Sequence, residues 1–167
     1  MLASEAIARA AKVGGRVTLR RIRLWQLHVD QHFDIPAEGT WEVDVDINAG
    51  QALNDRNLLV EVKYVVQVDM SGAPDEERGY RIASSWLLYY ELASADGVDN
   101  LDCESFAAVS GVFAAHPYQR ELVQRLTGQM GFEPLVLNVM QSPTDIRAGA
   151  DFEVGAATEL ETAIERM

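Results

Sequence analysis

The sequence predicts an α+β fold in which four antiparallel strands precede the main helices. Between Val17 and Leu92, apolar residues recur with period two, the spacing that places alternate side chains on one face of a strand. The segments between these runs are short and rich in Gly, Pro, Asn and Asp, which favours antiparallel neighbours over helical crossovers. After Leu92 the spacing of the apolar residues becomes helical.

The chain of 167 residues has the length of one domain, which can bury about two thirds of the surface that an unfolded chain exposes. Its single cysteine, Cys103, excludes an intrachain disulfide. The N-terminal residues lack the continuous apolar core of a secretory signal. No apolar run approaches the roughly 20 residues that span a bilayer. We therefore expect a cytoplasmic protein that does not insert into membranes.

The charge of the chain is strongly acidic, with 26 acidic against 14 basic residues and a formal net charge of −12. Nucleic-acid phosphates normally require a basic surface, so this composition argues against a nucleic-acid partner. The acidic excess has two explanations. It keeps the protein soluble, or it attracts basic partners and positively charged unfolded segments.

The first strand follows an N-terminal segment, residues 1–16, for which we expect a short helix. In this strand Trp25 and Val29 share one face, whereas Leu24 falls on the opposite parity. The adjacent apolar pair Leu24 and Trp25 marks this change of phase. It predicts a β-bulge or a strong local twist.

The next three strands have long runs with period two. The second alternates apolar with acidic residues over 41–47, and the third alternates over 58–70. The fourth strand, residues 80–90, is apolar on both faces toward its end, which is typical of a strand buried on both sides. Turn-forming residues separate these runs. We expect turns over residues 35–40, 48–56 and 71–79.

A helical pattern follows the fourth strand. Asp99 or Asp102 can act as the N-cap. Pro117 is expected to kink or end the helix, because it lacks an N–H donor and clashes with the carbonyl group four residues earlier. Gly111 lies in a run of small residues that permits close packing against another helix or another subunit. The apolar face of this helix contains Phe106, Val109, Val112 and Phe113.

Motifs for catalysis or cofactor binding are absent from the sequence pattern. The stretch VGGRV lacks the spacing and the lysine of a P-loop, and Ser84 and Ser85 lack the context of a nucleophile elbow. His28 and His32 stand roughly 13 Å apart on an extended strand, too far to share one metal ion. Cys103 lies near a helix start, but a lone cysteine is packed more often than reactive. We therefore expect no enzyme activity, no cofactor and no metal site.

The segment HPYQRELVQRLTGQMGFEPLVLNV, residues 116–139, resembles the SecB family of protein-export chaperones. In that family an aromatic-Pro-Tyr-x-Arg-Glu segment interrupts a long helix, and a Gly-Phe-x-Pro-Leu-x-Leu segment follows it. With the preceding strands, the resemblance covers residues 17–140. The matching residues are Pro117, Tyr118, Arg120, Glu121, Gly131, Phe132, Pro134, Leu135 and Leu137.

The resemblance implies a four-stranded antiparallel sheet with helices packed on one side, assembled as a homotetramer that is a dimer of dimers. It also implies an ATP-independent holdase that keeps unfolded or nascent clients in apolar grooves. Helix residues Val109, Val112 and Phe113 would then form oligomer contacts or core. The expected client-binding residues are Trp41, Val43, Val45, Phe132, Leu135, Leu137 and Met140, with Tyr118 shaping the turn beside them.

The chain departs from the family pattern at several positions. His116 replaces the usual aromatic residue before Pro117, and NVMQSPTDI replaces the family's proline and Asn-Phe segment. On the sheet face that SecB presents to the motor protein SecA, Asp30 matches one acid, whereas Gln26 and Ala83 stand where acids are expected. These departures fit, at least as well, the SecB-like chaperones that protect an antitoxin in a toxin–antitoxin system.

Three hypotheses follow. The chain is a general holdase of protein export with SecA as a further partner, a dedicated chaperone of an antitoxin, or a small-molecule-binding α+β domain with a pocket between sheet and helix. For Phe132, Leu135 and Leu137, simple packing in the core remains an alternative to client contact. The C-terminal segment, residues 141–167, is expected to be partly helical and to follow the SecB-like domain, residues 17–140.

Overall fold

The computed structural model of the protein describes residues 3–31, 41–70 and 79–140. Several expected features lie outside these residues: His32, the turn at 35–40 and the C-terminal segment 141–167. Of the turn expected at 71–79, only Gly79 is described. The elements in chain order are α1 (Ala3–Gly14), β1 (Val17–Gln31), β2 (Trp41–Asn54), β3 (Asn57–Met70), β4 (Gly79–Leu92), α2 (Asn100–Phe106), the π-helical η1 (Ala107–Gly111) and α3 (Val112–Gln129).

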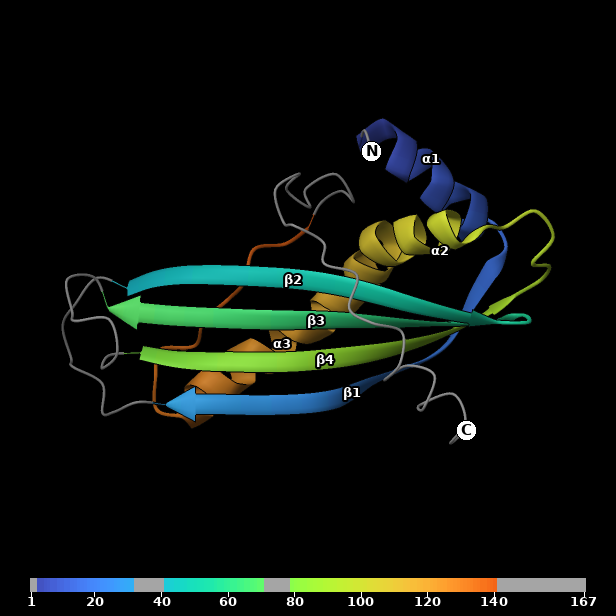
Figure 1. Cartoon of the computed structure of the whole chain (residues 1–167). Helices are drawn as coiled ribbons and strands as arrows, with labels where there is room; N and C mark the ends of the chain where they lie inside the picture. The colour runs from blue at the N-terminus through green and yellow to red at the C-terminus, as the bar shows by residue number, and fades with distance from the viewer. Residues whose placement is uncertain (1–2, 32–40, 71–78, 141–167) are drawn as a thin grey trace.

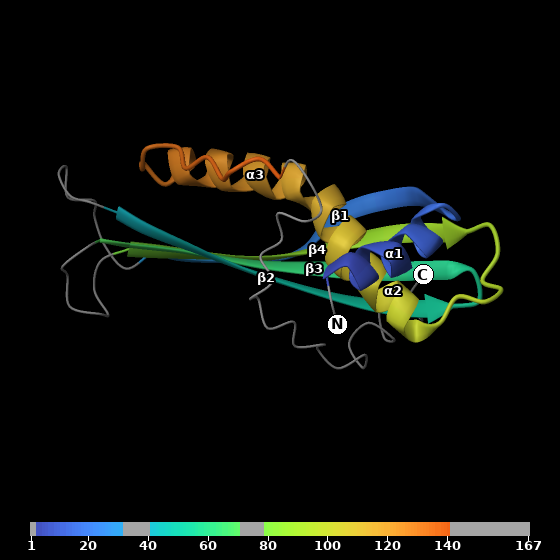
Figure 2. The ribbon, with the colours of Figure 1, turned by 90° about the horizontal axis from the view of Figure 1, so that it is seen from above.

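The four strands form one antiparallel sheet in the order β1-β4-β3-β2. The helices pack on one side of it, with α3 lying along that face (Figures 1 and 2). The predicted α+β architecture, a four-stranded antiparallel sheet with helices on one side, is confirmed. No helix in the described parts of the chain is long and apolar enough to cross a membrane.

The core lies between the sheet and the helices. The central strands β3 and β4 supply most of it, and each fully buried aliphatic side chain contributes roughly 1.5–3 kcal/mol relative to an exposed one. The opposite side of the sheet, here called the open face, carries the residues of the other parity. The buried apolar residues of the core include Leu58, Val60, Val62, Tyr64, Val66, Val68, Ile82, Leu88 and Leu92.

Two shifts interrupt the register between β1 and β4, one between Leu19 and Arg21 and one between Leu24 and Gln26. The second shift occurs at Leu24 and Trp25, where the change of apolar parity predicted a bulge. That prediction is confirmed. A bulge inserts one extra residue into a strand and changes which face the next side chains occupy.

Strand β2 is longer than the sequence indicated. A turn was expected over residues 48–56, but β2 pairs with β3 as far as Asn54, and only Asp55 and Arg56 form the turn. Asp55 has a φ of 52°, the left-handed conformation that Asp tolerates in tight turns. The expected position of the turn was wrong because continued pairing with β3 outweighs the weak strand propensity of Asn and Gly.

Helix α3 continues through Pro117 to its end at Gln129. Of the two outcomes expected at this proline, a kink or a helix end, the end does not occur, and the irregular part of the helical backbone is η1, which precedes α3. Gly111 closes η1, and a Cβ atom on it would lie 2.7 Å from Cγ1 of Val60 in β3. The close packing predicted at Gly111 is thus made against the sheet rather than against another helix.

An ionic cluster joins α1 to the start of α2. Asp99 and Asp102, the two expected N-cap residues, form a capping box in which each side chain accepts a hydrogen bond from the backbone N–H of the other. Asp102 is buried and also accepts from Arg9 at 3.1 Å and from Lys12. Burial alone would raise the pKa of Asp102, but the bonds from Lys12 and the Asp99 N–H hold it below its ordinary value.

Candidate functional site

An extended segment, residues 133–140, follows α3 and is here called the strap. It runs back along α3 (Figure 2), and three side chains of the helix bind its backbone. Because the contact points move toward the start of α3 as the strap advances, the two segments are antiparallel. The contacts are Thr127 Oγ1 with Leu135 N (2.9 Å), Arg120 Nε with Leu137 O (2.8 Å) and His116 Nε2 with Asn138 O (2.7 Å).

The contact through His116 is buried. Its side chain is 5% exposed, and its Nδ1 atom has no hydrogen-bond partner in the described part of the chain. Burial lowers the pKa of His116, the Asn138 carbonyl raises it, and the charge of Arg120 lowers it again. The net effect is a lowered pKa, so at neutral pH the imidazole is neutral and donates from Nε2 to Asn138.

The rings of Trp41, Tyr80 and Phe132 join the turn before the strap to the sheet. The centroid of Phe132 lies 4.5 Å from that of Tyr80 and 6.3 Å from that of Trp41, the latter in an edge-to-face arrangement. Trp41 belongs to the edge strand β2, whereas Tyr80 belongs to the central strand β4. The aromatic contacts therefore position the strap across the helix-facing side of the sheet.

The structure brings together seven of the predicted client-binding residues. Five of them belong to one apolar cluster. Met140 packs against a second cluster, which shares Val45 with the first. Val43 lies between Trp41 and Val45 on the same strand face and is 46% exposed. The residues packed in the first cluster are Trp41, Val45, Phe132, Leu135 and Leu137.

Two exposed residues that the sequence did not single out complete this surface. Val136 and Val139 on the strap are 53% and 60% exposed, whereas Leu137 between them is buried. Alternation along an extended segment could have identified Val136 from the burial of Leu137. We define the strap surface as Trp41, Val43, Val45, Phe132, Leu135, Val136, Leu137, Val139 and Met140.

The remaining predicted site residues lie elsewhere. The ring of Tyr118 is 43% exposed and lies 5.8 Å from that of Trp86 in β4, apart from the strap surface. Of the three residues expected at an oligomer contact or in the core, Val112 is fully buried and Val109 is half-buried against the core. Phe113 is 40% exposed and is available to a partner.

No family model matches the chain. The SecB-like chaperone Rv1957 of Mycobacterium tuberculosis is 31% identical over 166 residues, which span 89% of this chain and 91% of the relative. The chain belongs to the SecB-like chaperone family. A shorter match, to the SecB-like chaperone MT2006 of another strain of that species, is 31% identical over 70 residues, or 42% of this chain and 39% of the relative.

The fold agrees with this SecB-like assignment. The structure of Rv1957 in complex with a ChAD peptide from the HigA1 antitoxin matches with a TM-score of 0.72, covering 81% of this chain and 99% of that chain. At 18% sequence identity in that comparison, the match shows the shared fold. The strap surface is thus built on the architecture of a known SecB-like chaperone.

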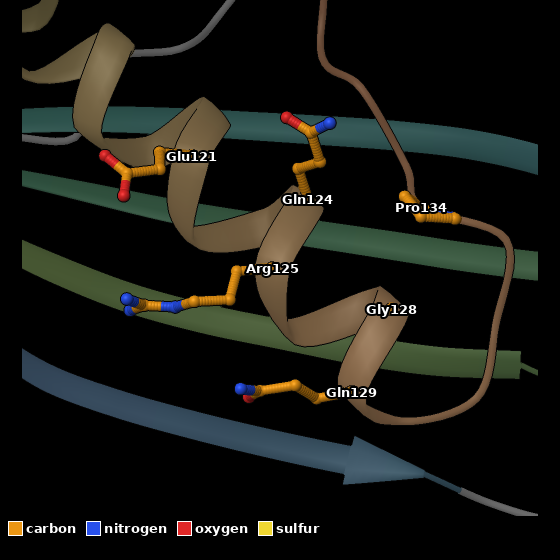
Figure 3. A pocket seen from close by; sticks show the side chains of 6 residues that line it. All are labelled: Glu121, Gln124, Arg125, Gly128, Gln129 and Pro134. Carbon is orange, nitrogen blue, oxygen red and sulfur yellow. The ribbon is translucent and has the colours of Figure 1, made fainter.

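A depression of about 450 Å³ lies beside the outer side of α3 in this SecB-like chaperone, with Pro134 of the strap at its rim (Figure 3). All of its lining residues are exposed, and they do not form the pocket between sheet and helix that the small-molecule hypothesis requires. The lining residues are Glu121, Gln124, Arg125, Gly128, Gln129 and Pro134.

The described residues that were considered for metal binding or nucleophilic chemistry form other polar contacts. Within residues 3–31, 41–70 and 79–140, no group of three or more His, Cys, Asp or Glu side chains could hold a metal ion. His28 is exposed and lies 2.9 Å from a carboxylate oxygen of Asp30. Ser84 is buried and donates to Gln119 at 2.7 Å, and the buried Ser85 donates to Glu61.

Proposed function

We propose that this SecB-like chaperone is an ATP-independent holdase that binds unfolded or nascent proteins on the strap surface. The observation that supports the proposal most is the exposure of Val43, Val136 and Val139, whose neighbours along the strand and the strap belong to the apolar clusters. Exposed apolar side chains that adjoin one another are typical of a surface that takes a partner. Such a surface binds by burying apolar area and needs no nucleotide.

The chemistry of the strap surface suits clients that share no sequence. Its contacts are aliphatic, aromatic or thioether groups, and unbranched Met140 can adapt to clients of different shape. Side chains of α3 bind the backbone of the strap, while the strap's valines are exposed. Because the relatives are chaperones and the surface offers packing rather than reactive groups, we infer that the protein is not an enzyme.

A dedicated antitoxin chaperone is the second candidate function. Its support is the relative Rv1957, which matches most of this chain and is known in complex with an antitoxin peptide. SecA has less support as a partner, since Gln26 and Ala83 replace expected acids and Asp30 contacts His28. The two candidates differ in client range and use the same surface.

We also infer assembly into a homotetramer. Strand β1 is 15 residues long and lies at an edge of the sheet, where unpaired backbone groups can pair with another chain. Leu19 and Leu27 on β1 and Phe113 on α3 are each 40–41% exposed and apolar. Native mass spectrometry should show tetramers at micromolar concentration, and a purely monomeric spectrum would contradict this inference.

The test of holdase activity is light scattering from a chemically unfolded client diluted into buffer without ATP. We expect the wild type to suppress scattering at near-stoichiometric oligomer. The double variant Val136→Asp/Val139→Asp should lose about tenfold in potency, because two charges would have to be buried against the client. Leu101→Asp is the matched control, since Leu101 is 39% exposed on α2, away from the strap surface.

The client series separates the two candidates. Suppression for several unrelated clients supports the general holdase, whereas suppression limited to an antitoxin supports the dedicated chaperone. Circular dichroism should show that both variants remain folded, because the substituted side chains are exposed. A folded double variant that suppresses scattering as well as Leu101→Asp does would contradict the assignment of the strap surface.

A further inference from the structure

The open face of the sheet has a basic corner where β1 begins and where β2 turns into β3. The two bulges of β1 contribute to it by adding Arg20 and Trp25 to the residues that normal alternation places there. Arg20 shows this orientation by bonding to Glu91, which lies on the open face of β4, at 2.9 Å. Trp25 shows it by stacking with Arg23, a residue of the same face.

An arginine lies between two aromatic rings in this corner. The guanidinium carbon of Arg23 lies 4.7 Å from the ring centroid of Trp25 and 5.6 Å from that of Tyr89. Beneath them, Leu59 and Leu87 form a small apolar cluster. Nε of Arg23 and the hydroxyl of Tyr89 are buried without a hydrogen-bond partner among the described residues.

The charge of this corner is opposite to that of the whole chain. We define the basic corner as Arg20, Arg21, Arg23, Arg56, Glu91, Trp25 and Tyr89. Its four arginines and one glutamate give it a net charge of +3, against −12 for the chain.

Much of that positive charge is available to a partner. Glu91 contacts Arg20 at 2.7 Å and Arg56 at 3.4 Å, so the one carboxylate of the corner is shared by two guanidinium groups. Arg21 is exposed and makes no hydrogen bond or ion pair within the described part of the chain. Trp25 is 42% exposed. The corner therefore offers free cationic groups beside an accessible aromatic ring.

We propose that the chain's own C-terminal segment, residues 141–167, docks on the basic corner. The segment contains six acidic residues and two arginines, a net charge of −4. Arginine binds carboxylates through charge-assisted hydrogen bonds, and in this corner Nε and Nη2 of Arg20 both contact Oε2 of Glu91. Phe152, Leu160 and Ile164 supply apolar groups for the exposed ring of Trp25.

The length of the segment allows this docking. It has 27 residues beyond Met140 and can span at most about 90 Å when extended. The path from the helix-facing side around an edge of the sheet to the open face is shorter, since four strands spaced about 4.8 Å apart are only about 15–20 Å wide. Because the segment is tethered to the same chain, its effective concentration at the corner is about millimolar. This exceeds the concentration of a free acidic partner that is present in trace amounts.

The other acidic segments outside the described residues are poorly placed. Residues 32–40 and 71–78 connect strand ends at the opposite end of the sheet from the turn at Arg56. From Gln31 back to Arg21, strand β1 alone spans roughly 33 Å. Loops of eight or nine residues with both ends fixed there cannot reach the corner and return.

The test uses the full chain with Arg21→Lys, which keeps the charge and introduces an amine that a carbodiimide can join to a carboxylate without a spacer. Arg125→Lys on the outer side of α3 is the matched control, since Arg125 is also exposed. Equal amounts of light and isotopically heavy chain are mixed before cross-linking, and mass spectrometry maps the products. Links within one chain are thereby distinguished from links between chains.

We expect links from the lysine at position 21 to carboxylates of residues 141–167 within one chain, at least about fivefold above the control. They should fall to the control level in 1 M salt, where the screening length shrinks to about 3 Å. Equal yields in both variants, or links only between light and heavy chains, would overturn the proposal. So would links that 1 M salt leaves unchanged.

A second measurement does not depend on the introduced lysine. Hydrogen exchange of residues 141–167 should become about tenfold faster when Arg20 and Arg21 are both replaced by Glu, because bound amides open less often than free ones. Since both arginines are exposed, the variant keeps its fold. Exchange that is equally fast in the wild type and the variant would overturn the docking, whatever the outcome of the holdase assay.

Discussion

The carbonyl oxygen of Asn138 lies 2.7 Å from Nε2 of the buried His116, and this contact fixes the strap to α3 next to the exposed Val139. The bond requires a proton on Nε2 and leaves Nδ1 without a partner among the described residues. A second proton would place a charge in a buried site beside Arg120. The attachment of the strap therefore depends on a neutral imidazole.

Stability should fall in mildly acidic solution because of His116. Its folded pKa lies below the ordinary value of 6.5, so the unfolded chain binds more protons as pH falls below that value. The stabilisation by neutral His116 is complete above pH 6.5 and is lost as pH falls from 6.5 toward the folded pKa. The urea midpoint of the wild type should accordingly drop between pH 7.5 and 5.5.

The variant His116→Gln supplies the control for this pH dependence. Its amide can still donate to Asn138 but does not titrate, so its midpoint should change less between the two pH values. The other charged or titratable groups near the imidazole are Arg120 on α3 and Tyr64 on β3, whose ring centroid lies 6.1 Å away. Burial raises the pKa of Tyr64 far above this range, so it contributes nothing. Parallel curves for both proteins would contradict the prediction.

Removal of Asp102 should destabilise the protein more than removal of Asp99. Asp102→Ala leaves Arg9 and Lys12 without their buried carboxylate and also breaks the capping box. We expect a loss of about 2 kcal/mol from the charge-assisted hydrogen bonds to Asp102, because the cations of Arg9 and Lys12 that remain are partly exposed and can be solvated. Asp99→Ala removes mainly the N-cap and should cost about 1 kcal/mol.

Urea unfolding followed by circular dichroism measures both losses. Hydrogen exchange of α1 adds a local readout, because Arg9 and Lys12 are the polar contacts of α1 with Asp102. Exchange in α1 should accelerate in Asp102→Ala and change little in Asp99→Ala. Equal losses of stability in the two variants would show that the ionic cluster adds nothing to the cap.

Cys103 should react slowly with thiol reagents in the native protein. Burial, with a smaller effect from Asp102, raises its pKa to about 11, so very little thiolate is present at pH 8. Reaction with a maleimide should accelerate by at least about 100-fold in 6 M urea, where the thiol is solvated and its pKa returns toward 8.5. Similar rates in both conditions would contradict the buried position of Cys103.

Much of the sheet could be predicted because its strands have a buried face, which enforces alternation in the sequence. The bulge at Leu24 and Trp25 was visible because it breaks that alternation. The bulge at Arg20 also changes the apolar parity, from Val17 and Leu19 to Ile22 and Leu24, but two arginines separate these pairs, so no adjacent apolar residues mark the change. The basic corner was missed because its residues come together only through strand pairing.

The site was predictable in composition but not in exposure. The apolar run PLVLNV indicated either core or binding surface, and only the contacts from Thr127, Arg120 and His116 decide which strap residues face outward. These residues precede their partners by 8 to 22 positions, so local spacing does not reveal them. The continuation of α3 through Pro117 was not predictable for a related reason, because packing of α3 on the sheet outweighs the loss of one helical hydrogen bond.

Gly111→Ala should destabilise the protein, although alanine is the better helix former. The added Cβ would lie 2.7 Å from Cγ1 of Val60, which is fully buried and, as a β-branched residue, has little freedom to move. We expect a net loss of about 1–3 kcal/mol from overpacking. Gly128→Ala is the matched control, because its Cβ would meet only Pro134 at an ordinary 3.6 Å. That variant should gain up to about 1 kcal/mol from helix propensity.

Urea midpoints of the two glycine variants should therefore shift in opposite directions from the wild type. The sign matters because both glycines lie in the same continuous helical stretch and would behave alike if helix propensity alone decided. A stabilised Gly111→Ala would mean that η1 can move away from β3 at little cost.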